Sequence, residues 1–111
     1  MDENINDWIS KKITSIDVVL FMKWTPETPQ CGFSSQVVQI LNYLCIEFSS
    51  VNVLDDESIR NGIKEYTNWP TIPQLYVKKE FIGGCDIITE MFESGELLEL
   101  LNTNGIDVNP S

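Results

Sequence analysis

Two short apolar runs separated by a helical pattern constrain the fold of this chain more than any other feature. Val18–Met22 is a β-branched and aromatic run typical of a buried strand, and Phe48–Leu54 alternates with the period of a second strand. A helix is predicted to begin near Gly32, and its expected core-facing residues are Phe33, Val37, Ile40, Leu41 and Leu44. Strand, helix and strand in this order require a right-handed parallel crossover.

The flanking segments add helices and a hairpin. Apolar spacing predicts an N-terminal helix within residues 1–15 and a helix over Glu57–Thr67, which Asp55-Asp56 can cap. The apolar stripe expected on this second helix is Ile59, Ile63 and Tyr66. Gln74–Val77 and Glu80–Gly83 predict an antiparallel pair joined at Lys78-Lys79, although two-residue turns favour Asn-Gly or Asp-Gly.

The C-terminal part of the chain predicts one more helical region. Asp86 can cap it after the Gly83-Gly84-Cys85 turn, and it is expected to run to about Leu101 with a break at Gly95. Residues 102–111 are predicted to form a polar tail. Residues 1–111 are therefore predicted to be one mixed α/β domain, which is also what a length of 111 residues favours.

Charge and composition exclude several classes of function. Seven basic and 17 acidic residues give a net charge of −10, which argues against a nucleic-acid partner. No apolar stretch approaches the ~20 residues that cross a bilayer, so no membrane segment is expected. Histidine is absent, which excludes Cys-His and Ser-His nucleophile pairs and histidine-containing metal sites. Three cysteines and an acidic N-terminal stretch predict a reducing, cytoplasmic location.

Cys31 is the strongest candidate for chemistry. It stands in the stretch TPQCGFSS, after a proline-rich loop and directly before the predicted helix. The free N–H groups and partial positive charge of a helix N-terminus favour a thiolate and lower a thiol pKa. Position 34 is serine, so the Cys-x-x-Cys pair of a dithiol site is absent. Local chemistry alone therefore predicts a reactive thiol with no resolving cysteine three residues later.

The other two cysteines are less specific. Cys45 falls on the apolar side of the predicted helix, four residues after Leu41, and is expected to be a core residue. Cys85 follows a glycine pair, which fits a close backbone approach to a ligand and an ordinary strand-to-helix turn equally well. In WPTIP, a cis bond before Pro73 would expose the backbone of Ile72 to an extended peptide, but most X-Pro bonds are trans.

Three motifs in this order resemble those of the monothiol glutaredoxins, which have the thioredoxin fold. They are CGFS after a Lys-x-Thr-Pro loop, then WPTIPQLYV, then FIGGCD, and the resemblance runs from about Asp17 to Leu101. It implies an α/β, thioredoxin-like fold with a central mixed four-stranded sheet flanked by helices.

The resemblance also implies a glutathione site. Cys31 corresponds to the active cysteine, and Lys23 and Arg60 to cations that face the glutathione carboxylates. Ile72, before a cis-Pro73, corresponds to the residue whose backbone pairs with the cysteinyl unit. Cys85 and Asp86 correspond to residues that bind the γ-glutamyl end, through backbone N–H groups and a carboxylate.

The family is associated with a [2Fe–2S] cluster held between two subunits. Each subunit supplies one cysteine thiolate, here Cys31, and two glutathione molecules supply the other two ligands. The implied function is cluster assembly or transfer to recipient iron–sulfur apoproteins, with a homodimer when loaded and a BolA-like protein as another partner.

Two other functions remain open at this stage. One is a glutathione-dependent oxidoreductase that removes glutathione from proteins through Cys31, with Cys85 as a distant resolving cysteine in one variant. The other is a regulatory adaptor that senses iron with a BolA-like partner. One departure from the family bears on all three functions, because Trp24 stands where the family typically has glycine. Its indole is expected to crowd the glutathione pocket, alter the loop or pack across the dimer contact.

Overall fold

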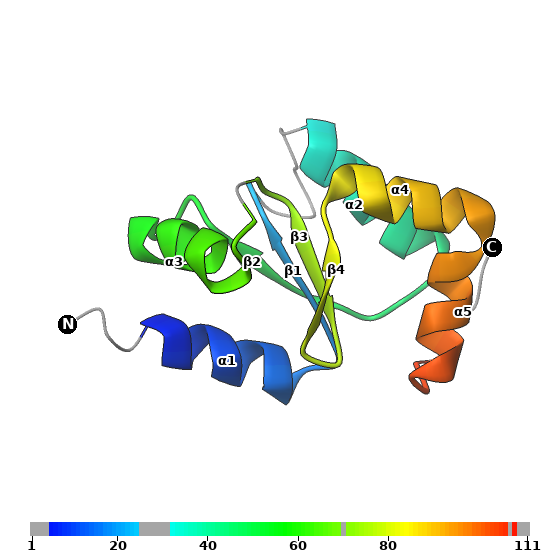
Figure 1. Ribbon diagram of the computed structural model, residues 1–111. Helices are drawn as coiled ribbons and strands as arrows, with labels where there is room; N and C mark the ends of the chain where they lie inside the picture. The colour runs from blue at the N-terminus through cyan, green and yellow to red at the C-terminus, as the bar shows by residue number, and fades with distance from the viewer. Residues whose placement is uncertain (1–4, 25–31, 70, 107, 109–111) are drawn as a thin grey trace.

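A four-stranded sheet with helices on both faces forms the protein (Figure 1). The computed structural model describes residues 5–24, 32–69, 71–106 and 108. The elements follow in the order α1 (Ile5–Ser15), β1 (Val18–Met22), α2 (Gly32–Tyr43), β2 (Ser49–Asn52), α3 (Glu57–Thr67), β3 (Gln74–Val77), β4 (Glu80–Gly83), α4 (Cys85–Ser94) and α5 (Glu96–Thr103). The thioredoxin-like mixed sheet flanked by helices is thereby confirmed.

The sheet has the strand order β2-β1-β3-β4. Strands β1 and β2 are parallel, with Val19 opposite Ser49, which confirms the parallel pairing predicted from the two apolar runs. Strand β3 is antiparallel to both β1 and β4. The hairpin joins at Lys78 and Lys79, whose φ angles of 50° and 64° are those of a two-residue turn with both residues left-handed.

Alternating residues of β1 divide the core into two layers. Val18, Leu20 and Met22 pack with the cluster under α2, α4 and α5. Val19 and Phe21 pack with the cluster that holds the buried residues of α1 and α3. Figure 1 shows the same arrangement, with α1 and α3 on one side of the sheet and α2, α4 and α5 on the other. Every residue of β1 is buried, as expected for a central strand.

Several predicted helix ends are confirmed. The Asp56 carboxylate accepts a hydrogen bond from the Ser58 N–H at 2.8 Å and caps α3. Gly95, with φ of 88°, separates α4 from α5. The polar tail begins later than predicted, because Asn102 and Thr103 still belong to α5.

Three apolar residues expected in the core are exposed. Phe33 is 63% exposed because the first turn of α2 extends beyond the strand ends, as Figure 1 shows. Tyr66, in the last turn of α3, is 40% exposed, whereas Ile63 is fully buried. Cys45 is exposed because it lies just beyond α2 in the left-handed conformation, with φ of 57°. Its neighbour Ile46 returns to the core instead.

Candidate functional site

One edge of the sheet, formed by the ends of its strands, brings together segments that are far apart in the sequence. Strands β1 and β4 end at this edge and β3 begins there, since Phe21 lies opposite Gln74 and Leu75 opposite Gly83. The residues just beyond these strand ends therefore converge. Among them are Lys23 after β1, Ile72 before β3 and Cys85 after β4.

A cavity of about 160 Å³ lies at this edge. It brings together three predicted site residues, Ile72, Cys85 and Asp86. The other lining residues are Phe33, Trp69, Thr71, Pro73, Gly84 and Ile87. A larger hollow of about 940 Å³ is lined by residues near the start of β1 and β2, including Asp17 and Ser49, and contains no predicted site residue.

The backbone before β3 has the geometry that the site needs. The Ile72–Pro73 peptide bond is cis, as the resemblance implied. The Ile72 side chain is buried in the core cluster beside α1 and α3. The register between β1 and β3 stops at Gln74, so the backbone of Ile72 lies outside the strand ladder. An extended peptide can pair with backbone groups of this kind.

The start of α4 differs from the prediction. Gly84, and not Asp86, is the N-cap, and Asp86 is the second residue of the helix. A side chain at position 84 would meet close neighbours, since an added Cβ would lie 3.3 Å from both the Pro73 carbonyl oxygen and Trp69 Nε1. The N-cap glycine makes no side-chain hydrogen bond to the first turn of α4, and Gly84, Cys85 and Asp86 line the cavity. The free N–H groups of a helix start suit an anion.

The two predicted cations do not line the cavity. Lys23 is half-buried at the end of β1, and Arg60 is half-buried in the first turn of α3. Strand β1 pairs with β2, and α3 follows β2 in the chain, whereas the cavity is lined mainly by residues before β3 and at the start of α4. A ligand that contacts both the cavity and the cations must therefore extend across the strand ends.

Ser34 is a site residue that the sequence reasoning missed. Its side chain is fully buried, and its hydroxyl oxygen accepts a hydrogen bond from the Lys23 backbone N–H at 3.2 Å. The bond ties the end of β1 to the first turn of α2. The sequence did contain a signal for Ser34. It is a small polar residue on the core-facing side of the predicted helix, at the position where a dithiol site has its second cysteine.

Trp24 has a left-handed backbone, with φ of 69°. Glycine adopts this conformation without steric cost, which explains physically why glycine suits this position. The Trp24 N–H donates to Asn52 Oδ1 at 3.0 Å, and its side chain is 43% exposed. The expectation that Trp24 alters the loop is a statement about residues 25–31, which lie outside the described residues.

Cys31 also lies outside the described residues, and with it the proposed pairing of Cys31 with Cys85. Cys45 follows the far end of α2, about 18 Å from the start of that helix at 1.5 Å per residue. Within the described ranges, no three Cys, Asp or Glu side chains gather in a way that would hold a metal ion. The same part of the chain has no helix long and apolar enough to cross a bilayer.

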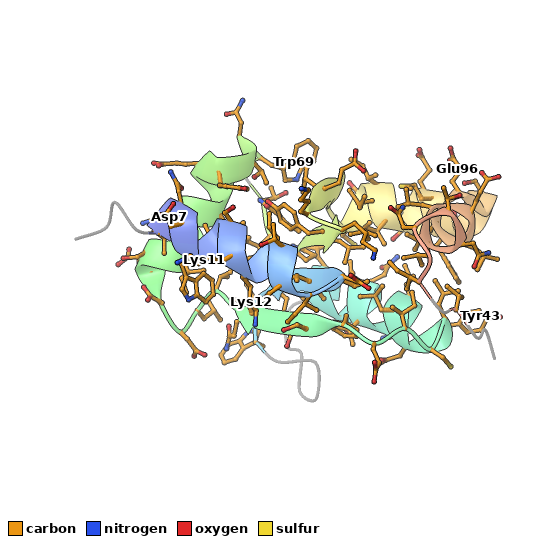
Figure 2. All side chains as sticks on the ribbon, turned by 90° about the horizontal axis from the view of Figure 1, so that it is seen from below. Asp7, Lys11, Lys12, Tyr43, Trp69 and Glu96 are labelled. Carbon is orange, nitrogen blue, oxygen red and sulfur yellow. The ribbon has the colours of Figure 1, made fainter. Side chains whose placement is uncertain are left out.

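Trp69 forms one wall of the cavity, and Figure 2 shows it between α3 and α4. Its ring packs against Phe81 with centroids 5.6 Å apart. In the described part of the molecule, its buried Nε1 has no hydrogen-bond partner.

Known proteins with the same arrangement are numerous. The chain matches the glutaredoxin family model over residues 18–82. It is 57% identical over 93 residues to an uncharacterized monothiol glutaredoxin of Synechocystis sp., covering 84% of this chain and 87% of that protein. It is 55% identical over 95 residues to a chloroplastic monothiol glutaredoxin of Arabidopsis thaliana, covering 86% of this chain but only 55% of that protein.

A solved structure agrees with this match. The solution structure of a monomeric truncated mutant of Trypanosoma brucei 1-C-Grx1 has a TM-score of 0.84 and 41% identity, over 100% of this chain and 97% of that one. The family model covers more than half of the chain and includes the strands that build the site edge. The chain therefore belongs to the glutaredoxin family, and within it to the monothiol glutaredoxins.

Proposed function

We propose that this protein binds glutathione at the described edge and carries a [2Fe–2S] cluster between two copies of the chain for delivery to iron–sulfur apoproteins. The observation that carries the proposal is the convergence of Ile72, Cys85 and Asp86 on one cavity beside a cis proline. Lys23 and Arg60 supply positive charge on the β2 side of the same edge. A peptide with a carboxylate at each end suits backbone groups, a helix N-terminus and cations together.

The residues have distinct roles in this proposal. The backbone of Ile72 pairs with the cysteinyl unit of glutathione, and the N–H groups at Cys85 and Asp86 hold the γ-glutamyl carboxylate. The Asp86 carboxylate faces the γ-glutamyl ammonium group, while Lys23 and Arg60 face the glycyl carboxylate. In this proposal the glutathione thiol is the partner of Cys31, the residue that precedes α2 in the chain.

The donor set of the chain fits a shared cluster. A [2Fe–2S] cluster takes four thiolates, and Cys45 lies beyond the far end of α2 from the Cys31 end. One chain therefore cannot supply the ligands alone. Two Cys31 thiolates and two glutathione thiolates complete the set, and a BolA-like protein is the second proposed partner in place of one subunit.

Reconstitution tests the proposal directly. The protein is incubated anaerobically with iron, sulfide and glutathione, and its visible spectrum and size are then measured. We expect a coloured dimer that is lost with Cys31→Ser or without glutathione and is retained with Cys45→Ser. A colourless monomer with an intact fold would contradict the cluster proposal.

Thiol exchange at Cys31 is the second candidate. Its thiolate would attack the protein–glutathione disulfide and release the target thiol, leaving Cys31 joined to glutathione. A second glutathione thiolate would then release oxidised glutathione and regenerate Cys31. The observation that favours this route is that Ser34 fills the position of a local resolving cysteine. Rapid reduction of a glutathionylated peptide without cluster formation would support it.

The compartment stays a prediction. The odd number of cysteines, without paired spacing, favours a reducing compartment such as the cytoplasm, whereas the relatives include chloroplastic and mitochondrial proteins. Fractionation of the source cells with an antibody against the protein would locate it.

A further inference from the structure

Gln74 is a buried polar residue that the proposed function does not use. It is the first residue of β3, its side chain has no exposure, and it does not line the cavity. Ser34 is the other buried polar residue of the described chain. A buried amide is retained at low cost only when its donors and acceptor are satisfied.

Both amide hydrogens of Gln74 are directed at the loop that precedes Pro73. Nε2 donates to the Trp69 carbonyl oxygen at 3.1 Å and to the Thr71 carbonyl oxygen at 3.2 Å. These contacts also determine which way the amide lies, because the flipped amide would set its oxygen against two carbonyl oxygens. The Gln74 amide therefore holds two carbonyl groups of one loop at the same time.

The amide oxygen connects this loop to α3 and to β3. Oε1 lies 3.2 Å from Thr67 Oγ1 and 3.4 Å from the Tyr76 hydroxyl. Thr67 is the last residue of α3, and its Oγ1 also accepts the Trp69 N–H at 3.2 Å. The single hydroxyl proton of Thr67 is shared with the Ile63 carbonyl oxygen at 2.8 Å, so Tyr76 supplies the second donor to Oε1.

We propose that Gln74 is a positioning residue for glutathione binding, which rests on the proposed function above. By holding the carbonyls of Trp69 and Thr71, it sets the path of the loop that ends in Ile72 and Pro73. That loop provides one wall of the cavity and the backbone of Ile72. A loop already in its bound shape does not have to be ordered when the ligand arrives, and binding is tighter for that reason.

Two variants separate positioning from general stability. Gln74→Met keeps the length of the side chain and removes both donors to the loop. Tyr76→Phe is the matched control, because it removes a contact to Oε1 and leaves the Nε2 contacts in place. We expect both to lower the melting temperature, but only Gln74→Met to weaken glutathione binding, by about tenfold in Kd measured by calorimetry.

The outcomes distinguish the two proposals. Equal glutathione affinity of wild type, Gln74→Met and Tyr76→Phe would overturn the positioning role and leave the proposed function intact. Failure of the wild-type protein itself to bind glutathione would contradict the proposed function instead.

A measurement on the wild-type protein covers the case in which Gln74→Met does not fold. The side-chain NH₂ protons of Gln74 should exchange with solvent at least about tenfold more slowly than those of Gln39, whose side chain is on the surface. Equal exchange rates would show that the amide does not hold the loop and would overturn the proposal without any variant.

Discussion

The backbone N–H of Trp24 lies 3.0 Å from Oδ1 of Asn52, the same oxygen that accepts the Leu54 N–H at 3.0 Å. One side chain at the end of β2 thereby fixes the chain leaving β1 and the chain leaving β2. Trp24 makes this bond with a left-handed backbone, a conformation that is unfavourable for a residue with a Cβ.

Trp24→Gly should stabilise the protein. Glycine adopts a φ of 69° without the steric cost. The hydrogen bond to Asn52 is kept, because residue 24 contributes only its backbone N–H to it. We expect the free energy of unfolding in urea to rise by about 0.5–1 kcal/mol, the strain relieved less the added entropy of the unfolded chain. Trp24→Ala is the control, since it removes the indole and keeps the strain. Equal stability of the two variants would show that the backbone is not strained.

Ser34→Ala should destabilise the connection between β1 and α2. The Lys23 N–H would lose its acceptor in a part-buried position, which costs about 1–3 kcal/mol. Ser35→Ala is a neighbouring control, because Ser35 is less buried and its hydrogen-bond partner among the described residues, Gln39, is on the surface of the same helix. Urea unfolding of both variants checks the difference. If Ser34→Ala and Ser35→Ala lose the same unfolding free energy, the Ser34–Lys23 hydrogen bond does not stabilise the connection between β1 and α2.

Gly84→Ala should disturb the cavity wall. Its Cβ would lie 3.3 Å from the Pro73 carbonyl oxygen and from Trp69 Nε1, so these groups must shift. We expect a loss of about 1–2 kcal/mol in unfolding free energy together with a change in Trp69 fluorescence. Gly32→Ala is the matched variant, since no described atom lies within 4 Å of its added Cβ. A Gly84→Ala protein as stable as Gly32→Ala would contradict the close approach.

Tyr76 should make the fold sensitive to alkaline pH. Burial, with a smaller contribution from Tyr66, raises the pKa of the Tyr76 hydroxyl well above its ordinary value of about 10. Above pH 10 the unfolded chain loses this proton and folded Tyr76 keeps it, so stability falls by up to about 1.4 kcal/mol per pH unit. Stability present below pH 10 is thus lost as the pH rises. Urea titrations at pH 8–11 should show a shallower decline for Tyr76→Phe, and identical slopes would exclude this cause.

The β3–β4 turn should be improvable. Lys78 and Lys79 both adopt positive φ, for which Asn-Gly is better suited. We expect the double variant Lys78→Asn with Lys79→Gly to raise the melting temperature and to increase the free energy of unfolding by about 1 kcal/mol. The 3.1 Å ion pair of Lys78 with Asp17 is largely exposed and contributes little. Asp17→Asn measures the contribution of the ion pair separately. If this variant loses much of the free energy of unfolding, removing Lys78 should destabilise the protein instead.

Local patterns in the sequence determined the elements and most of their boundaries. The apolar run Val18–Met22, the cap at Asp56 and the break at Gly95 all follow from neighbours a few residues apart, and the structure confirms each. The resemblance to the monothiol glutaredoxins also implied that Ile72, Cys85 and Asp86 belong to one site, and all three line the same cavity.

Only the tertiary structure decided which side chains at element ends are buried. Phe33, Tyr66 and Cys45 fit the apolar pattern but are exposed, and each lies in the first or last turn of a helix or just beyond it. The Ser34 hydroxyl accepts from Lys23, eleven residues earlier in the chain, and the Gln74 amide joins β3 to the preceding loop and to the end of α3. Periodicity reports which face of an element is apolar, whereas burial and polar pairing depend on what other segments place against that face.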